Sequence, residues 1–247
     1  MASLGTTVAG ADIFSGANVH VTFNGRIEPR SLPRFEPAPV RLFLKGALSA
    51  ADGNEPPSLL RVTIALNRHG EVRTVGLPVC RKRSITSSTT RQALAACRDA
   101  LVGHGRFKAR IEIPDLAPFP ANGRVLAFNA RLHGRPVILA HIYGREPVPT
   151  TRVLTLTFQR QRSGAFGTTI SLTLPNARKN WGHVTGFSLY LHRRYEYRHR
   201  VHSLISASCP APRGFDSAVF KAAKGTYYLA DGRVITRVLS GSCRVRG

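Results

Sequence analysis

The sequence has few acidic residues, few lysines and almost no tryptophan or methionine. Its 247 residues include 13 Asp and Glu, one Trp and one Met, against 36 Lys and Arg, so the formal net charge is +23. Only 6 of the basic residues are lysine, and the other 30 are arginine. The scarcity of carboxylates leaves few candidates for paired acid and base catalysis.

Sequence motifs of the common enzyme classes are also missing. Gly-x-Ser-x-Gly, His-Glu-x-x-His, the phosphate loop and the calcium loop do not occur. Gly103-His104-Gly105 precedes a predicted strand and not a helix, so it is not a dinucleotide fingerprint. No apolar stretch is long enough to span a bilayer. The sequence therefore predicts no catalytic residue, no cofactor and no transmembrane segment.

Two groups of titratable residues come nearest to a catalytic or metal site. Glu112 and Asp115 form a close carboxylate pair and lie at a strand end. His192, His199 and His202 are the closest histidines, but on one strand His199 and His202 point to opposite faces. Zinc binding would require a hairpin that brings them together, so we expect no metal site. A hydrolase whose site is assembled from residues far apart in the sequence is one further functional hypothesis.

Short runs that alternate apolar and polar residues recur along the chain, which is typical of half-buried strands. One helix is predicted at Thr90–Ala100, with Ala93, Leu94 and Cys97 on one face. The predicted strands are 18–24, 39–48, 60–67, 106–113, 124–131, 136–143, 152–159, 168–174, 184–191, 218–229 and 233–239.

This pattern favours an all-β fold of two tandem, Ig-like β-sandwiches, with the short helix in the first. Pro147 and Pro149 remove backbone donors, so we place a domain boundary at Gly144–Thr150. The domains would be 17–146 and 151–247. Residues 1–16 would be a signal-peptide remnant or a disordered terminus, because Ala9-Gly10-Ala11 matches a cleavage site but no positive or long apolar region precedes it.

Four cysteines, Cys80, Cys97, Cys209 and Cys243, lie at the edges of β-type segments. They allow three pairings. Both halves share the order strand, Arg-containing turn, Cys beside Pro, glycine and aromatic strand, by duplication or by coincidence. This repeated order favours one disulfide bond between Cys80 and Cys97 and another between Cys209 and Cys243. Because no Cys-x-x-Cys pair indicates zinc or redox chemistry, we expect disulfides and not four buried thiols.

An arginine-dominated surface is suited to phosphate and carboxylate partners. The densest basic run is 193–202, and its candidate polyanion-binding residues are Arg193, Arg194, Tyr195, Tyr197, Arg198 and Arg200. As one strand, the run would place Arg194, Arg198 and Arg200 on one face and the tyrosines on the other, where they could stack on bases. The same alternation describes an outer strand with tyrosines in the core and arginines in water.

Three segments carry a resemblance to a family. Ile64–Gly70, Gly76–Cys80 and Cys209–Gly214 resemble uncharacterised exported proteins of GC-rich actinobacteria. The resemblance covers most of the chain and implies secretion and disulfides, but it carries over no functional residue. We therefore expect a non-catalytic, exported binding or structural module of the cell envelope. The alternative is a specific polyanion-binding protein, for nucleic acid or an anionic cell-wall polymer, that uses the Arg/Tyr run.

Overall fold

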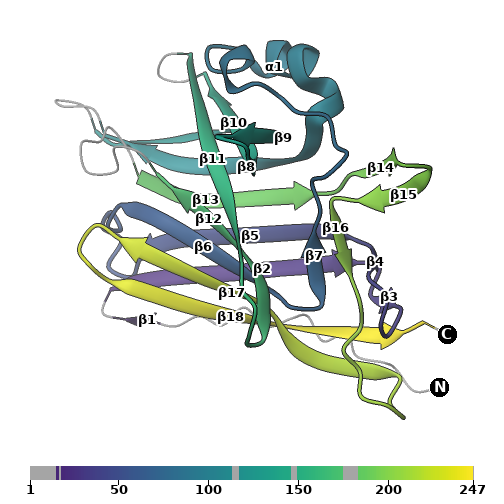
Figure 1. The fold of residues 1–247 in the computed structure, drawn as a ribbon. Coiled ribbons are helices and arrows are strands. Elements are labelled where there is room, and N and C mark those ends of the chain that lie inside the picture. The colour runs from purple at the N-terminus through teal and green to yellow at the C-terminus, as the bar shows by residue number, and fades with distance from the viewer. Residues whose placement is uncertain (1–14, 17, 113–116, 146–148, 175–182, 247) are drawn as a thin grey trace, which may run out of the picture.

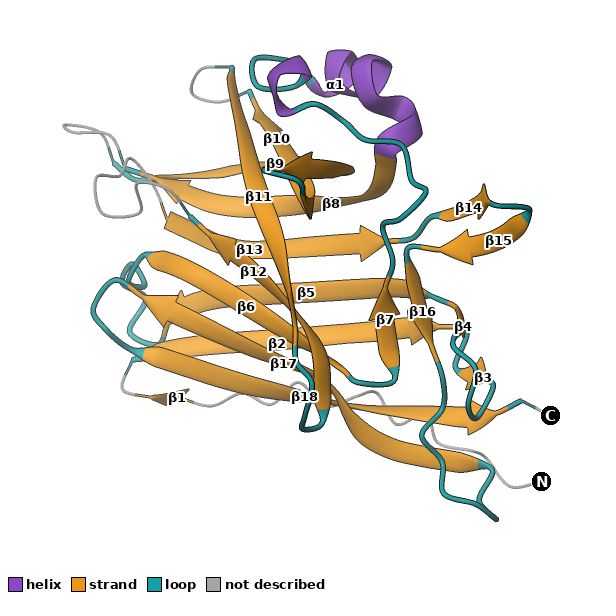
Figure 2. Cartoon of the chain, viewed as in Figure 1, coloured by secondary structure: helices purple, strands orange, loops and turns teal. Residues whose placement is uncertain are grey.

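The computed structural model describes residues 15–16, 18–112, 117–145, 149–174 and 183–246. The predicted N-terminal segment Leu4–Ala11 lies outside them. The described residues form mostly strands and one α-helix, which confirms the β-rich prediction with a single short helix (Figures 1 and 2). The elements are β1 (Ser15–Gly16), β2 (Val19–Glu28), β3 (Ser31–Leu32), β4 (Ala38–Pro39), β5 (Arg41–Ala50), β6 (Leu59–Asn67), β7 (Gly70–Val72), η1 (Lys82–Ser84), α1 (Thr90–Cys97), η2 (Arg98–Ala100), β8 (Leu101–Ile111), β9 (Phe119–Leu132), β10 (Arg135–Gly144), β11 (Thr150–Arg160), β12 (Phe166–Thr173), β13 (His183–Leu191), β14 (Arg194–Tyr197), β15 (Arg200–Ser203), β16 (Ile205–Ala207), β17 (Ser217–Leu229) and β18 (Val234–Val245).

Strands from both halves of the chain alternate in one 13-stranded sheet. Its order is β1-β2-β5-β13-β8-β9-β10-β11-β12-β6-β17-β18-β3. β13 lies between β5 and β8, and β6 lies between β12 and β17, so second-half strands pair directly with first-half strands. The expected arrangement of two tandem Ig-like sandwiches is therefore not confirmed.

The proline-rich segment that suggested a domain boundary lies at the turn of a β-hairpin. β10 and β11 pair in register from Val137 with Thr157 up to Gly144 with Thr150. Residues 146–148 lie outside the described part of the chain. Prolines interrupt backbone pairing only where they stand within a strand, so they are compatible with the end of a hairpin, and the sheet continues across this point.

The sheet curls until its last long strand, β18, lies against β2 near the other end (Figure 1). The Nε of Arg237 on β18 donates to the carbonyl oxygen of Val21 at 3.3 Å. Alternate residues therefore point either into the enclosed space or out toward solvent. The inward residues form the main hydrophobic core, which includes Phe23, Leu44, Ile64, Leu66, Ile138, Ile170, Leu191, Tyr227 and Leu239.

Helix α1 covers the outer face of β9 and β10 (Figure 2). Thr89 begins the helix with a capping box to Gln92, a common signal for a helix start. Ala93 and Cys97 are buried as predicted, and they pack with Phe128 and Leu139 in a second core. Apolar residues on both faces of β9 are thus buried, which explains its continuous apolar run.

Two disulfides join the predicted partners. Cys80 is bonded to Cys97, which ties α1 to the loop before it, and Cys209 is bonded to Cys243 on β18. The loops they close span 17 and 34 residues. By the loop-entropy relation, these bonds contribute about 3 and about 4 kcal/mol to stability.

Two smaller sheets complete the fold. β16 pairs with both β4 and β7 in a three-stranded sheet, which lies beside one end of the curled sheet (Figure 1). β14 and β15 form a separate two-stranded ribbon that projects from the same side (Figure 2). The predicted strands 218–229 and 233–239 pair as β17 and β18 on either side of a hairpin turn at Asp231-Gly232, where Gly232 has a φ of +89°.

Gly105 on β8 is required by the close approach of β13. A Cβ atom at this position would overlap the carbonyl oxygen of Ser188. We expect Gly105→Ala to lower the free energy of unfolding by about 1–3 kcal/mol, the usual cost of overpacking. Gly144→Ala is the matched control, because the nearest atom to its added Cβ would be the Cζ of Phe107 at 3.9 Å. Denaturant unfolding measures both, and an equal loss in the two variants would contradict the packing argument.

Tyr227 is 2% exposed, and its hydroxyl has no hydrogen-bond partner among the described residues. Burial raises the pKa of this phenol above its ordinary value of 10.0. Above pH 10 the unfolded state loses this proton while the folded state keeps it, so stability falls as pH rises.

We expect Tyr227→Phe to reduce this alkaline loss of stability and to change stability at pH 7 by no more than about 1 kcal/mol, since no hydrogen bond is lost. Denaturant unfolding from pH 7 to 11 tests this, with Tyr228→Phe at the partly exposed neighbour as control. The same alkaline loss in Tyr227→Phe as in the wild type would refute the assignment.

Candidate functional site

The outer face of β5, β13, β8 and β9 carries basic side chains in an aligned row. Lys45 pairs with Ser188, Ser188 with Arg106, and Arg106 with Arg124. Neighbouring residues in such a ladder lie on the same face of the sheet. Lys45, Arg106 and Arg124 therefore form a basic row across four strands, and Lys108 extends it by one step along β8. All four side chains are exposed.

An aromatic row runs next to the basic row. Phe43 pairs with Tyr190, and Tyr190 with His104. Phe43 and His104 are each two residues from a member of the basic row, and Tyr190 is two residues from Ser188 between them. The rings of Tyr190 and His104 have centroids 5.4 Å apart, and the His192 ring lies 5.0 Å from that of Tyr190. Stacking surface and positive charge are therefore adjacent, as in surfaces that bind flexible anionic chains.

His192 contributes to this face mainly as a neutral ring. Partial burial, together with the neighbouring charges of His104, Arg41 and Arg193, lowers the pKa of its imidazole. A lowered pKa keeps the ring uncharged at neutral pH. His192 therefore adds stacking surface and not a permanent positive charge.

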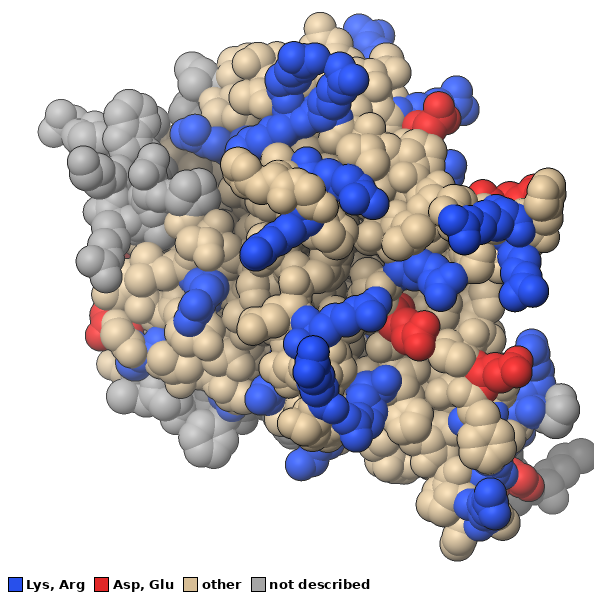
Figure 3. Space-filling model, in the orientation of Figure 1, with Lys and Arg blue, Asp and Glu red and all other residues tan. Residues whose placement is uncertain are grey.

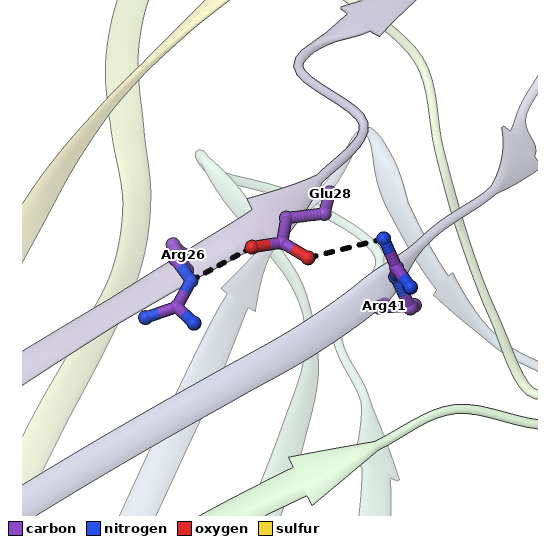
Figure 4. Close-up of polar contacts among 3 residues, drawn as sticks. All are labelled: Arg26, Glu28 and Arg41. Carbon is purple, nitrogen blue, oxygen red and sulfur yellow. Dashed lines mark hydrogen bonds and ion pairs between the residues drawn. The ribbon is translucent and has the colours of Figure 1, made fainter.

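Glu28 neutralises part of the charge at the edge of this face (Figure 4). Its carboxylate accepts from the Nε of Arg26 at 2.9 Å and lies 3.3 Å from the Nη2 of Arg41. The hydrogen bond from Arg26 is the main cause that lowers the pKa of Glu28. The guanidinium of Arg26 also lies 4.7 Å above the Phe43 ring. Both arginines are thus engaged within the protein.

The basic row has no such neutralisation. Within the part of the chain that the structure describes, no carboxylate forms an ion pair with any of its four members. We call the surface that combines the two rows the basic face; it comprises Arg26, Arg41, Phe43, Lys45, His104, Arg106, Lys108, Arg124, Tyr190 and His192.

A hollow of about 820 Å³ continues the basic face toward α1. Arg124 belongs to both, and Arg91 and Arg145 bring two further guanidinium groups to its walls. Tyr143, the neighbour of Arg124 in the ladder, lines it too. Three arginines around one hollow make it a site for an anionic group.

The opposite side of the curled sheet differs in how its charges are used. Figure 3 shows basic side chains spread widely over the side of β6, β17 and β18. There, Arg61 lies 3.8 Å above Tyr228 and Lys224 lies 5.2 Å above Phe166, whereas on the basic face Arg26 lies above Phe43 but no described Lys or Arg lies above the Tyr190 ring. Positive charge alone therefore does not distinguish the basic face, whereas exposed basic residues in line beside an aromatic row do.

The Arg/Tyr run predicted as one strand is a hairpin. β14 and β15 are joined by Arg198 and His199, which both have positive φ, of 53° and 59°. Tyr197 pairs with Arg200, so Arg200 lies on the tyrosine face and not with Arg194. Arg193 donates to the carbonyl oxygen of Asp99 at 3.4 Å.

The tyrosines of this hairpin pack against the loop after β7. The hydroxyl of Tyr195 donates to the carbonyl oxygen of Val75 at 2.8 Å, and partial burial raises its pKa. The ring of Tyr197 covers Gly76 so closely that a Cβ there would lie 2.5 Å from it. Arg198 lies 5.3 Å above the Tyr197 ring. Tyr195 and Tyr197 are therefore engaged in contacts within the protein. Polyanion binding by the hairpin remains a prediction.

The described members of the two candidate groups for a catalytic or metal site contact other residues. Glu112 pairs with the Nε2 of His183 at 3.1 Å, while Asp115 lies outside the described residues. His199 is in the hairpin turn, and His202 contacts Tyr195, with ring centroids 5.8 Å apart. Among the residues that the structure describes, no cluster of three His, Cys, Asp or Glu could hold a metal ion.

Comparison with protein-family models, with curated proteins and with solved structures gave no match. The resemblance to exported actinobacterial proteins therefore remains a prediction. In the described part of the chain, no helix has the length and apolar character needed to cross a membrane.

The basic face was missed by sequence reasoning because its residues come from distant strands. Lys45 and Arg124 are isolated basic residues in alternating runs, and Arg106 alternates with Lys108 and Arg110 on a different strand. Their position on the polar side of those runs could be read from the sequence. Their alignment could not, since it depends on which strands are neighbours.

Proposed function

We propose that the protein is a non-catalytic binding module of the cell envelope, and that its basic face binds a linear anionic polymer. The observation that carries the proposal is the row of Lys45, Arg106 and Arg124, exposed, without carboxylate partners and next to an aromatic row. Arginine and lysine neutralise the polymer charge, and the rings contact its less polar parts.

The dimensions of the row favour a chain over a single small anion. Strands are about 4.8 Å apart, so the three steps from β5 to β9 place Lys45 and Arg124 about 14 Å apart. Successive charges of a polymer could meet successive basic residues over this length. The arginine-lined hollow would then hold one anionic group at the end of the row.

The two disulfides support the envelope part of the proposal. Disulfides persist in oxidising compartments outside the cytosol. This favours an anionic envelope polymer with phosphodiester or carboxylate groups over a cytosolic nucleic acid. Export itself remains part of the proposal.

Charge reversal at the row tests the binding surface. We expect Lys45→Glu/Arg106→Glu/Arg124→Glu to weaken binding to a glycerol-phosphate polymer at least tenfold, at an ionic strength of about 150 mM. The slope of log affinity against log salt concentration should become shallower by about 2, because three contacts to the polymer are lost. Fluorescence anisotropy with a labelled polymer, titrated from about 50 to 300 mM salt, measures both quantities.

Two triple variants with the same change in net charge serve as controls. Arg160→Glu/Lys221→Glu/Arg244→Glu changes exposed residues on β11, β17 and β18 and should leave most of the affinity intact. Arg194→Glu/Arg198→Glu/Arg200→Glu tests the hairpin. A loss confined to the hairpin variant would transfer the site to the Arg/Tyr run, and equal losses in all three would mean that only net charge matters. Preferred binding of oligothymidylate would favour nucleic acid over the envelope polymer.

Removal of the Glu28 carboxylate at the edge of the face should have the opposite effect. Glu28→Gln frees Arg26 and Arg41 from an ion pair, so we expect affinity for the same polymer to rise about two- to fivefold. Glu71→Gln, an exposed change of equal charge on β7, is the control. An equal gain in both variants would show that Glu28 does not act locally.

A further inference from the structure

A second cavity lies inside the curled sheet, at the end beside the β4-β16-β7 sheet. Its volume is about 240 Å³, and it is enclosed by parts of β2, β5, β6, β7, β16, β17 and β18. Inward side chains make its walls apolar, among them Leu44, Leu66, Ile205 and Leu239. The basic face lies on the outer surface of the sheet, and Arg26 belongs to it and also lines the cavity.

The cavity exists because small residues occupy the walls at this end. Gly25 on β2 and Ala223 on β17 line it, as does Gly241 on β18. A Cβ at Gly25 would lie 3.0 Å from the terminal carbons of both Leu44 and Leu239, so these strands approach too closely for a larger residue there.

The rest of the interior is filled differently. At Gly46, farther along β5, a Cβ would lie 2.5 Å from the Phe187 ring, and the Phe23 and Tyr227 rings pack edge to face with centroids 6.5 Å apart. Protein interiors are normally packed without voids, and an apolar void remains dry and accepts apolar ligands. The space between Leu44, Leu66 and Ala223 thus has the properties of a binding cavity.

The mouth of the cavity is polar and cationic. Arg30, which lines it, is exposed, and no described carboxylate forms an ion pair with it. His69 and Ser208 also line the cavity, with the Nδ1 of His69 3.4 Å from the Oγ of Ser208. An apolar chamber with a free guanidinium at its entrance is complementary to a molecule with an apolar tail and an anionic head.

We propose that this cavity binds a small amphiphile with an aliphatic tail between Leu44, Leu66 and Ala223 and an anionic head, such as a carboxylate, at Arg30. A cavity of 150 Å³ accommodates benzene, so a volume of about 240 Å³ takes about nine or ten carbon atoms. The matching ligands are therefore medium-chain alkanoates.

Calorimetric titration of the full chain with octanoate, decanoate and decan-1-ol tests the proposal. The wild type should bind decanoate and, more weakly, decan-1-ol. Ala223→Leu should fill the cavity and weaken both at least tenfold, while the melting temperature is retained or raised, because filling a void adds packing. Leu239→Phe, which also enlarges a wall residue, provides a second cavity-filling variant should Ala223→Leu fail to fold.

Arg30→Glu tests the contribution of the anionic head to binding separately from that of the aliphatic tail. It should weaken decanoate about tenfold, the loss of one charge-assisted contact, and leave decan-1-ol unchanged. Arg213→Glu, exposed and outside the cavity, has the same charge change and should bind both as the wild type does. The proposal is overturned if the wild type binds neither ligand, if the filled variants bind as the wild type does, or if Arg30→Glu and Arg213→Glu weaken decanoate equally.

Discussion

Backbone pairing of β13 with both β5 and β8 joins the two halves of the chain into one sheet. β13 follows β12 in sequence but lies five positions from it in the strand order. With β13 in place, β2 and β5 are fixed relative to β8 and β9, and the sheet can curl until β18 reaches β2. The close approach of Ser188 to Gly105 and the alignment of Lys45 with Arg106 both depend on this one strand.

Local features of the fold could be read from the sequence because they depend on neighbouring residues. The alternation of Leu60–Asn67, the capped helix at Thr90 and the turn at Asp231-Gly232 have signals within a few residues of themselves. The disulfide partners followed from the order of elements around each cysteine. In each case the interaction that sets the structure is close in sequence or is marked by a rare residue type.

Strand order has no such local signal. Alternation shows which residues of β13 face inward, but β5 and β8 contribute backbone groups that any strand could pair with. Pro147 and Pro149 are equally suitable for a linker and for a hairpin turn, so the domain boundary could not be distinguished from a bend. The turn at Arg198 and His199 was hidden for a related reason: neither residue is Gly, Asn or Asp, which usually mark positive φ.

In this protein, a high density of basic residues along the sequence does not coincide with the surface on which basic side chains are available for binding. In the run 193–200, arginines are adjacent along the chain, but the interleaved tyrosines are occupied by the loop at Val75 and Gly76. On the basic face, basic residues from β5, β8 and β9 meet through the ladder, and the Glu28 carboxylate binds arginines at the edge. Because consecutive residues of a strand point to opposite sides, Leu44 on β5 borders the inner cavity while the neighbouring Lys45 side chain belongs to the outer face. The same strand can therefore serve an apolar cavity and a cationic surface, and the side chains of one can change without altering those of the other.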